Sequence, residues 1–376
     1  MRDLLEIREE LDDIDKEILR LYEERMKLCT EVAEYKINTG KKVFDKERED
    51  AKLEALGNLA SNDFNRHGVQ ELFAQIMAAS RKLQYQMLTD KGVKGRLPFA
   101  EIESLDKEHS RVVFQGVEGA YSQAAMKAFF GEQVNAFPVE QWRDAMQMIS
   151  EGMADYAVLP IENSTAGFVS EMYDLLMKYD HYIVGEQIIR IDHKLLGVPG
   201  AKLSDIKRVY SHEQALMQCE EYLNCHRNWK QTALENTARA AKKVAEDGDI
   251  TQAAIASAYA GESFGLQILE EGICANAVNS TRFIVVSNQR VFVKNANKIS
   301  ICFELPHKSG TLYRILSHFI FNNLNMTKIE SRPMPNVDWE YRFFVDFEGN
   351  LNDTAVKNAI RGINEEAVNV KILGNY

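Results

Sequence analysis

The sequence has no long apolar run and few of the residues that build disulfide or metal frameworks. No stretch among its 376 residues reaches the roughly 20 apolar residues that a membrane-spanning helix needs, and the N-terminus opens on an acidic helical pattern rather than a secretory signal. Its cysteines, Cys29, Cys219, Cys225, Cys274 and Cys302, are scattered without paired spacing. We therefore expect reduced thiols in a cytoplasmic protein, with no metal site.

An excess of positive charge is also missing. Lys and Arg number 45 against 56 Asp and Glu, and the net charge of -11 argues against a role in binding nucleic acid. Hydrophobic residues at 45% and charged residues at 27% are ordinary for a globular protein, and the length favours two or three domains. A negative protein that handles anionic substrates must gather its cations locally.

Proline is absent from the first 87 residues, and glycine is rare there. We expect an all-helical domain over residues 1–88, followed by a linker over 89–110 in which Lys, Gly, Pro and acids mix without a period. Short apolar strands alternate with helical patterns over 111–291, which predicts an α/β domain. Residues 298–376 follow the order strand, helix, strand, strand, helix, strand. In the first and the last of these strands apolar and polar residues alternate, so we expect both to be half-buried.

Apolar residues follow one face of the first predicted helix at spacings of three and four. This stripe consists of Leu4, Ile7, Leu11, Ile14, Ile18, Leu21, Leu28, Val32 and Tyr35. Its length predicts packing against other helices over many turns. Arg8, Arg25 and Lys36 each stand four residues after a member of the stripe, where an unpaired cation would be costly. Each could pair with a neighbouring acid, but the three together favour an anion site.

Two further helices add polar groups to the same seam. Asp45 can cap a helix that carries Arg48 and Glu49. A third helix, expected over residues 69–88, places Ser80 and Gln84 four residues apart on one side. Taken singly, a buried Ser or Gln is usually structural.

In this order the residues resemble the motif of the all-helical chorismate mutase family. The resemblance implies that the two substrate carboxylates are bound by Arg8, Arg25 and Arg48. It implies catalytic hydrogen bonds to the ether oxygen from Lys36 and Gln84. The substrate hydroxyl would be held by Asp45 and Glu49, with support from Ser80. In the family the first helix spans both subunits of a dimer, and the resemblance assigns Arg8 to the partner's site.

The reaction of that family suits these residue types. The unimolecular rearrangement of chorismate to prephenate needs no nucleophile and no proton transfer. Catalysis therefore holds the reactive conformer and stabilises the charge that develops as the C–O bond breaks. Guanidinium groups suit the first task, and a Lys–Gln pair suits the second.

In the middle domain, short polar residues follow several predicted strands. Candidate helix caps are Ser122, Ser164, Ser211 with His212, and Asn236 with Thr237. Helix N-termini attract carboxylates, although every α/β helix needs a cap, so caps alone decide little. Gly116 and Gly119 lack the central glycine of the dinucleotide fingerprint, so we expect no nicotinamide cofactor.

Residues 111–291 resemble prephenate dehydratases over their whole length. The resemblance rests on Gly119-Ala120-Tyr121-Ser122, Pro160-Ile161-Glu162-Asn163-Ser164, Ser211-His212 with Gln218, and Asn279-Ser280-Thr281-Arg282-Phe283. It implies two α/β lobes with a cleft between them, like a type 2 periplasmic binding protein. It makes Thr281 the main catalytic residue, which donates a hydrogen bond or a proton to the leaving hydroxyl, and Arg282 the residue that orients the acid. The implied pocket contains Ser122, Glu162, Asn163, Ser164, Ser211, His212, Gln218, Thr237 and Phe283.

The dehydratase reaction needs little catalytic assistance, because loss of CO2 and hydroxide creates an aromatic ring. An acid at the leaving oxygen and a partly desolvated carboxylate suffice, and no metal or cofactor is implied. His212 is a second candidate acid, ranked below Thr281 because a histidine at a helix cap is more often structural.

Residues 298–376 resemble the ACT domains that follow prephenate dehydratases. The resemblance implies that phenylalanine binds at an interface between two copies. Its effector site would comprise Ser309, Gly310, Thr311, Leu312, Glu330, Ser331 and Arg332. The alternative is that Gly310 only frees the start of a helix and that Arg332 is solvated.

Together these patterns predict a bifunctional enzyme that converts chorismate to prephenate and then to phenylpyruvate, inhibited by L-phenylalanine. We expect a homodimer, with further pairing into tetramers left open. A mutase fused to a dehydrogenase would need the missing glycine fingerprint. The other alternative is a non-catalytic sensor, in which the cleft domain binds an amino acid or keto acid.

Overall fold

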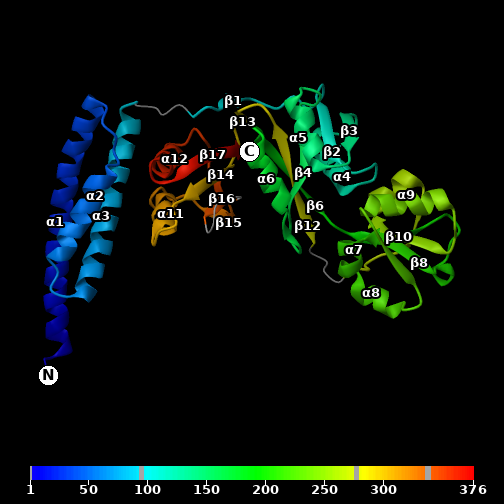
Figure 1. Ribbon diagram of the computed structural model, residues 1–376, viewed down its shortest axis with the longest axis horizontal. Coiled ribbons are helices and arrows are strands. Elements are labelled where there is room, and N and C mark those ends of the chain that lie inside the picture. Colours follow the sequence, from blue (N-terminus) through cyan, green and yellow to red (C-terminus); the bar gives the residue numbers. More distant parts are fainter. Residues whose placement is uncertain (1, 93–96, 275–278, 335–339) are drawn as a thin grey trace. The chain divides into compact units, whose positions relative to one another are not determined.

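The structure, a computed structural model, describes residues 2–92, 97–274, 279–334 and 340–376 (Figure 1). The chain divides into two compact units, and the division does not follow the order of the sequence. The first unit combines residues 1–97 with 297–372, and the second combines 98–296 with 373–376. The helical N-terminal domain therefore packs with the C-terminal domain, which follows it by about 200 residues.

Three helices form the N-terminal domain, as predicted. They are α1 (Leu4–Thr39), α2 (Lys46–Asn58) and α3 (Asp63–Asp90). Asp45 caps α2 by accepting a hydrogen bond from the backbone N–H of Arg48 over 3.2 Å. The third helix begins six residues earlier than the periodicity predicts, because Asn62 caps it by accepting from the N–H of Asn65 over 2.8 Å.

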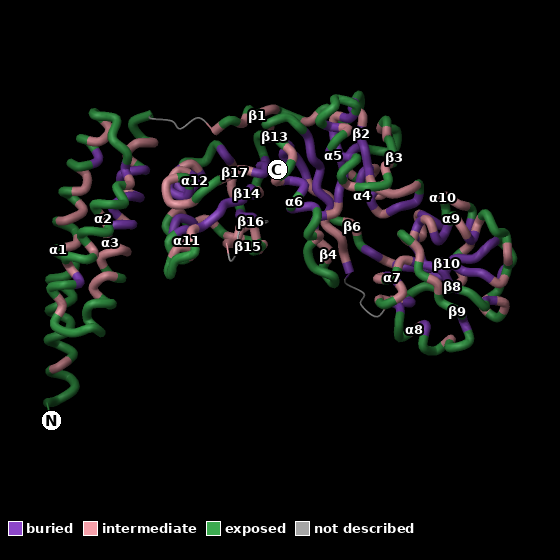
Figure 2. Tube along the Cα trace, in the orientation of Figure 1, coloured by how far each residue is buried: buried purple, intermediate pink, exposed green. Residues whose placement is uncertain are grey.

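The apolar stripe of α1 has little cover within the chain (Figure 2). Of the residues of α1, all of which the structure describes, only Ala33 is buried. Leu11 and Ile18 are each more than 50% exposed, although an apolar face of this length is stable only when another surface covers it. The predicted helix packing is met where α1 contacts α3, for example where Arg25 reaches Ser80 and where Ala33 is buried.

The C-terminal domain has the predicted order of elements. It contains β14 (Lys298–Leu305), α11 (Thr311–Phe321), β15 (Met326–Pro333), β16 (Tyr341–Glu348), α12 (Thr354–Glu366) and β17 (Val368–Asn375), with strand order β15-β16-β14-β17. The expectation that β14 is half-buried was wrong, because side chains on both of its faces are buried. Its polar side chains are paired instead: Ser300 donates to Asp346 over 2.5 Å, and Glu304 binds Arg342.

The second unit consists of two α/β lobes, as predicted. The sheet of the first lobe has the order β6-β12-β4-β2-β3. Its strands are β2 (Arg111–Gln115), β3 (Asn135–Val139), β4 (Tyr156–Asn163), β6 (Tyr182–Arg190) and β12 (Ser280–Ser287), with β5 (Gly167–Phe168) beside β4. Its helices are α4 (Tyr121–Phe130), α5 (Trp142–Ser150) and α6 (Ser170–Lys178). Val158 and Val285, fully buried, lie at the centre of its core.

The second lobe is built around a sheet of order β11-β7-β10-β8-β9. Its strands are β7 (His193–Gly197), β8 (Arg208–His212), β9 (Lys230–Leu234), β10 (Gln252–Ser257) and β11 (Gln267–Glu270). Its helices are α7 (Glu213–Gln218), α8 (Glu220–Cys225), α9 (Thr237–Asp247), α10 (Ala258–Phe264) and the short 3-10 helix η1 (Leu203–Asp205). Both faces of β10 are buried, so this strand forms the floor on which the helices pack.

Two segments differ from the expected linker and ending. Part of the predicted linker forms β1 (Ala100–Ile102), which pairs in parallel with β13 (Val291–Val293). The last residues of the chain, 373–376, belong to the second unit, where Gly374 pairs with Ile183. The backbone hydrogen bonds of short segments need a partner strand, and period alone does not reveal it.

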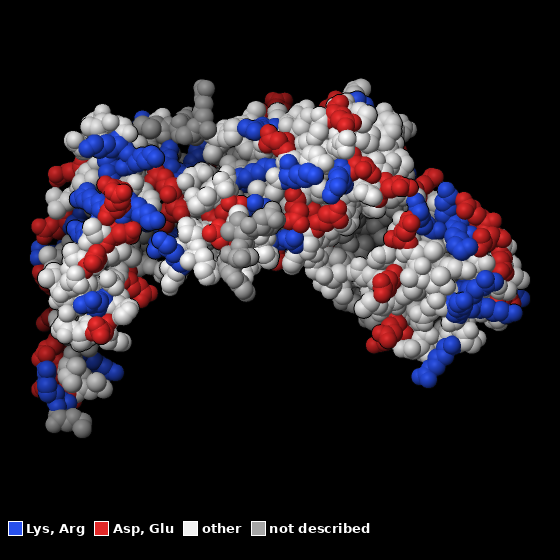
Figure 3. All heavy atoms as spheres, viewed as in Figure 1, with Lys and Arg blue, Asp and Glu red and all other residues white. Residues whose placement is uncertain are grey.

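The described part of the chain contains no helix that combines the length and apolar character of a membrane span. Acidic and basic side chains are interspersed over the face drawn in Figure 3. All five cysteines are free thiols.

Candidate functional sites

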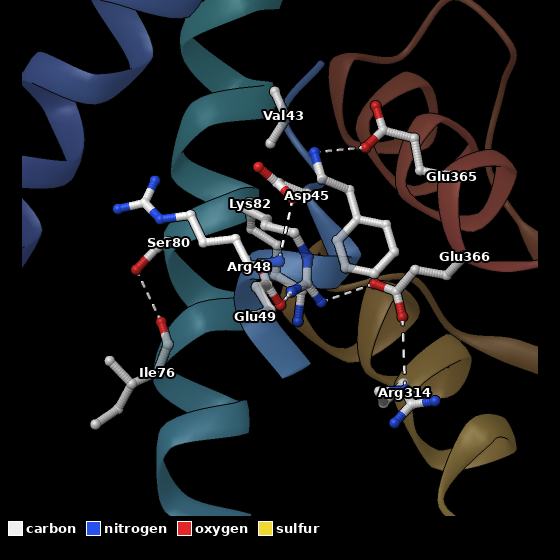
Figure 4. Close-up of polar contacts among 12 residues, drawn as sticks. Val43, Asp45, Arg48, Glu49, Ile76, Ser80, Lys82, Arg314, Glu365 and Glu366 are labelled. Carbon is white, nitrogen blue, oxygen red and sulfur yellow. Dashed lines mark hydrogen bonds and ion pairs between the residues drawn. The ribbon is translucent and has the colours of Figure 1, made fainter. Parts of the chain in front are cut away.

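Most of the expected mutase residues line one cavity of about 110 Å³ in the helical domain. Its wall includes Arg25, Lys36, Asp45, Arg48, Glu49, Ser80 and Gln84. They come from all three helices and from the turn before α2. In Figure 4, Arg48 and Glu49 extend from α2 on the side of α3 that carries Ser80. The seam cations therefore gather around one small cavity, as an anion site requires.

The cations of this cavity are held in place by short polar contacts. Arg25 donates from Nη1 to the Ser80 hydroxyl over 2.5 Å, and Lys36 donates from Nζ to the carbonyl of Val43 over 2.6 Å. Burial, together with the nearby charge of Arg48, holds the pKa of the Lys36 ammonium below its usual value, and Asp45 opposes this effect. A cation with a lowered pKa beside further cations is ready to accept an anion.

Arg8 lies apart from this cavity. It stands 17 residues before Arg25 in the same helix, and at a rise of 1.5 Å per residue the two Cα atoms are about 25 Å apart. Arg8 is exposed and does not line the cavity. Within a single chain, Arg8 and Arg25 therefore cannot bind the same small molecule.

Arg81 lines the same cavity, and the sequence analysis missed it. Its guanidinium group binds the carboxylate of Glu49 and, over 2.8 Å, the carboxylate of Glu366 in α12. Arg81 follows Met77 by four residues on the buried side of α3, so the spacing rule that selected Arg25 would have selected it too.

A larger cavity of about 510 Å³ lies between the two lobes of the second unit. Thr165 and Ala166, from the turn after β4, and Asn279, which directly precedes β12, come from the first lobe. The second lobe contributes Gln214, Met217, Gln218 and Cys274. Two of the motifs singled out in the sequence, those around Asn163 and Thr281, therefore meet at one wall of this cavity.

Asn163 organises this wall. Its Oδ1 atom accepts from the N–H groups of Thr165 and Ala166 over 3.0 and 2.9 Å, which fixes the orientation of the amide. Its Nδ2 atom then donates to Asn279 Oδ1 over 2.8 Å and to Thr281 Oγ1 over 2.9 Å. Because the Thr281 oxygen accepts this bond, its own proton is available to another acceptor.

Arg282 points to the other face of β12. Adjacent strand residues alternate in direction, and Arg282 binds Glu186 over 2.7 Å, Glu162 over 3.6 Å and the hydroxyl of the last residue, Tyr376, over 2.6 Å. The expected placement of Glu162 and Arg282 in one pocket with Thr281 is therefore corrected: the two form an ion pair on the opposite side of the strand.

Three other expected pocket residues have structural positions. Ser122 donates to the carbonyl of Gln115, and Ser211 donates to the carbonyl of Ile255 over 2.6 Å. Both hydroxyls are buried and satisfied by backbone. Phe283 packs in the core of the first lobe. We correct the expectation that these three side chains line the pocket.

The predicted caps are placed as follows. His212 caps α7 by accepting from the N–H of Gln214 over 3.3 Å. Asn236, rather than Thr237, caps α9. Ser164 accepts from the N–H of Ser280 over 2.9 Å and so joins the two motif segments. Of the predicted pocket residues, Gln218 lines the cavity, whereas Asn163 and Ser164 support its wall.

A histidine that the sequence analysis missed orients Gln218. His193 Nε2 lies 3.2 Å from Gln218 Oε1, and its Nδ1 lies 3.1 Å from the Tyr121 hydroxyl. Burial lowers the pKa of His193 to about 4, opposed by the bond to Gln218, so the ring is neutral near pH 7. Since an amide oxygen can only accept, Nε2 carries the proton, and the Gln218 NH2 group is left to donate elsewhere.

Gly119 brings the lobes into close contact. Its φ of +82° is in the left-handed region, and a Cβ atom there would lie 3.0 Å from the Cα atom of Ala260 in α10. Only glycine meets both demands. This explains why the first motif of the middle domain begins with glycine.

The expected effector residues lie on two elements of the C-terminal domain. Gly310, with a φ of +77°, precedes α11, and the Thr311 hydroxyl donates to the carbonyl of Lys308 over 2.9 Å. Ser309 and Gly310 are exposed, and Thr311 and Leu312 are half-buried. Glu330, Ser331 and Arg332 lie in β15, the edge strand of this sheet.

Comparisons with known proteins agree with this arrangement. Residues 7–85 match the model of chorismate mutase type II, and residues 112–291 match that of prephenate dehydratase. A bifunctional chorismate mutase/prephenate dehydratase of Buchnera aphidicola is 34% identical over 100% of this chain and 96% of its own length. That of Escherichia coli K12 is 32% identical over 99% and 96%.

A solved structure is similar to part of the chain. Prephenate dehydratase from Arthrobacter aurescens, in complex with L-Phe, is 31% identical with a TM-score of 0.65, over 71% of this chain and 89% of its own. Together, the full-length relatives and this structure support both catalytic domains, the mutase and the dehydratase. The chain belongs to the family of bifunctional chorismate mutase/prephenate dehydratases, and it carries the isomerase and lyase activities of that family.

Proposed function

We propose that the cavity of the helical domain is the site at which chorismate rearranges. The observation that supports this most strongly is the convergence of seven of the eight expected residues on one small space. Arg25 and Arg48 bind the substrate carboxylates, Asp45 and Glu49 hold its hydroxyl, and Ser80 fixes Arg25. Lys36 and Gln84 donate to the ether oxygen, which gains negative charge as the C–O bond breaks and the new C–C bond forms.

We propose that the eighth residue, Arg8, acts in the site of a second copy. Two observations support a homodimer: the separation of Arg8 from Arg25 along one helix, and the exposed apolar stripe of α1. A second α1 packed along the stripe would bury it and bring the partner's cation to the carboxylates. Sedimentation at working concentration tests this, and a monomer would contradict it.

We propose that prephenate binds in the cavity between the lobes of the second unit. Gln218, with its NH2 group free to donate, binds a carboxylate, and Thr281 donates a hydrogen bond to the leaving hydroxyl. The bond from the ring to the carboxylate carbon breaks, its electron pair completes the aromatic ring, and the hydroxyl leaves as water after gaining a proton. Thr281 is joined to the cavity wall through Asn163, which supports its role.

We propose that the C-terminal domain is an ACT domain that binds L-phenylalanine and lowers both activities. The order of its elements supports this, as does the L-Phe complex of the Arthrobacter relative. An edge strand such as β15 can meet a second copy, which would place Ser331 and Arg332 at an interface. Inhibition requires that the effector bind one state of the enzyme better than another.

The test is phenylpyruvate formation from chorismate by the purified protein, without added cofactor, with and without L-phenylalanine. We expect product, and less of it when the amino acid is present. Thr281→Ala should then accumulate prephenate. If Thr281→Ala keeps full dehydratase turnover, the assignment of Thr281 is wrong. A cleft that binds prephenate without turnover would instead favour the sensor alternative. The cytoplasmic location remains a prediction from the sequence.

A further inference from the structure

The carboxyl end of α12 packs against the mutase helices through two consecutive glutamates. Glu365 accepts from the backbone N–H of Phe44 over 3.0 Å and from the hydroxyl of Tyr85. Glu366 accepts from Arg81 over 2.8 Å and from His318 over 3.0 Å. In Figure 4 both glutamates extend from α12 toward the mutase helices. The contacts to Phe44, Tyr85 and Arg81 join residues more than 250 positions apart in the sequence.

Both glutamates meet parts of the mutase domain that adjoin its cavity. Phe44 directly precedes Asp45, and Arg81 directly follows Ser80. The guanidinium group of Arg81 also lies 4.7 Å above the ring of Phe44. The C-terminal domain thus contacts two segments that carry residues of the mutase cavity.

Arg81 joins the two domains through buried ion pairs. Its side chain is only 5% exposed, and it binds Glu49 with one amino group and Glu366 with the other. Glu366 is 6% exposed. Although burial alone would raise the pKa of Glu366, His318 and Arg81 hold it below its usual value, so the carboxylate is charged. A buried cation between two carboxylates has a fixed position, because moving away from either one leaves a charge unpaired.

The C-terminal domain fixes Glu366 in turn. His318 of α11 is 1% exposed and donates to Glu366, and it lies against Gly362 of α12, where a Cβ atom would be within 2.4 Å of the ring. Any larger residue at 362 would displace His318. The chain of contacts therefore runs from α11 through His318, Glu366 and Arg81 to Glu49 in the cavity.

We infer that Arg81 is a positioning residue of the mutase reaction, and that Glu366 of the C-terminal domain holds it there. Arg81 fixes the carboxylate of Glu49, which the proposed function assigns to the substrate hydroxyl, and the inference rests on that assignment. The mutase cavity is thus completed by a domain that lies beyond the dehydratase in the sequence. Displacement of α12 moves Arg81 and lowers mutase activity without any change in the dehydratase residues.

The test uses Glu366→Gln in the full-length protein. The amide keeps the volume but loses the charge that holds Arg81, so we expect kcat/KM for chorismate to fall between about ten- and a hundredfold, the loss typical of a small misplacement in a site. Dehydratase turnover of added prephenate, measured on the same sample, should stay within twofold and shows that the second unit is folded. An unchanged far-ultraviolet circular dichroism spectrum shows the same for the helices of the first unit. Arg81→Lys, which keeps the charge but binds only one carboxylate, should lower kcat/KM similarly.

Arg361→Met is the matched control. Arg361 lies in the same helix and donates to the Tyr85 carbonyl and the Thr89 hydroxyl, each over 3.3 Å, away from the cavity. It should leave kcat/KM within twofold. An equal loss in Arg361→Met and Glu366→Gln would show that docking of α12 matters in general, and would overturn the role of Arg81.

A double-mutant cycle with Glu49→Gln separates positioning from stability. If Arg81 acts through Glu49, the effect of Glu366→Gln should largely vanish in the Glu49→Gln background. Full additivity would overturn the inference. Lys36→Met distinguishes a failure of the proposed mutase site from a failure of the inference about Arg81. If Lys36→Met leaves mutase activity intact, the assignment of the site itself fails. If Lys36→Met abolishes activity and Glu366→Gln does not reduce it, only the inference fails.

Discussion

The side-chain amide of Asn163 donates a hydrogen bond to the hydroxyl oxygen of Thr281 over 2.9 Å. Two backbone N–H groups hold the amide oxygen in the turn after β4, so the amide cannot rotate to accept from Thr281. The hydroxyl proton is thereby left for an acceptor other than Asn163. The Thr281 hydroxyl is a weak acid, and this arrangement leaves its proton for the oxygen that departs from the substrate.

Asn163→Asp hardly changes the size of the side chain, but we expect it to impair the dehydratase strongly. A carboxylate at this position can only accept, so it would take the Thr281 proton away from the substrate. We expect kcat for prephenate to fall by about a hundredfold, the lower range of a lost acid, with mutase activity unchanged. The measurement is phenylpyruvate release at saturating prephenate. Equal kcat values for Asn163→Asp and the wild type would show that the direction of this bond is irrelevant.

Mixed dimers should reveal whether Arg8 acts across subunits. Arg8→Ala and Lys36→Met should each abolish mutase turnover in a pure dimer. When the two variants are unfolded and refolded together, half of the dimers pair one of each, and each such dimer has one intact site. We expect about a quarter of the wild-type activity to return. No recovery, in a mixture shown to contain the mixed dimer, would place Arg8 and Lys36 in the same chain's site.

Mutase activity should begin to decline at a lower pH than it would if Lys36 had the pKa of an ordinary lysine. Burial and Arg48 lower the pKa of Lys36, and the ammonium loses a donor proton as the pH rises through that lowered value. We expect kcat/KM for chorismate to be highest below this pKa and to fall above it. The guanidinium group of Lys36→Arg does not titrate in this range. The activity that remains in this variant should therefore show no such alkaline decline. A wild-type profile that stays flat to about pH 10.4, the ordinary lysine value, would contradict the lowered pKa.

The second unit should lose stability as the pH falls from about 6.5 to about 4. Burial lowers the pKa of His193 to about 4 in the folded chain, from the ordinary histidine value of 6.5. In this window the unfolded chain binds a proton that the folded chain does not, so acid favours unfolding. The full effect is about 3 kcal/mol in the free energy of unfolding.

His193→Gln removes the titrating group and keeps hydrogen-bonding capacity. Thermal unfolding of the wild type and the variant, compared at pH 7 and pH 5, should show a smaller drop in Tm for the variant. His212→Gln in the same lobe is a suitable control, because His212 caps α7 and is only half-buried. If wild type and His193→Gln lose the same Tm, the buried histidine does not set the acid limit.

Local sequence determined the helices, the strands and the faces on which the polar residues lie. Spacings of three and four placed Arg25 and Lys36 on one side of α1, and the cap at Asp45 placed Arg48 and Glu49 after it. Alternation and turn residues gave the order of the C-terminal elements. These features depend on neighbours within a few positions, so a single sequence contains them.

Tertiary structure alone decided which distant residues meet. Thr281 and Arg282 are adjacent in one motif, yet they lie on opposite faces of β12 with different partners. Phe283 lies in the core of the first lobe, because helices and strands distant in the sequence pack around it. Arg81 met Glu366 across 285 positions, because the packing of α12 on α3 depends on the shapes of two domains. No local period encodes such a contact, and only the folded chain supplies the low-dielectric surroundings that make it matter.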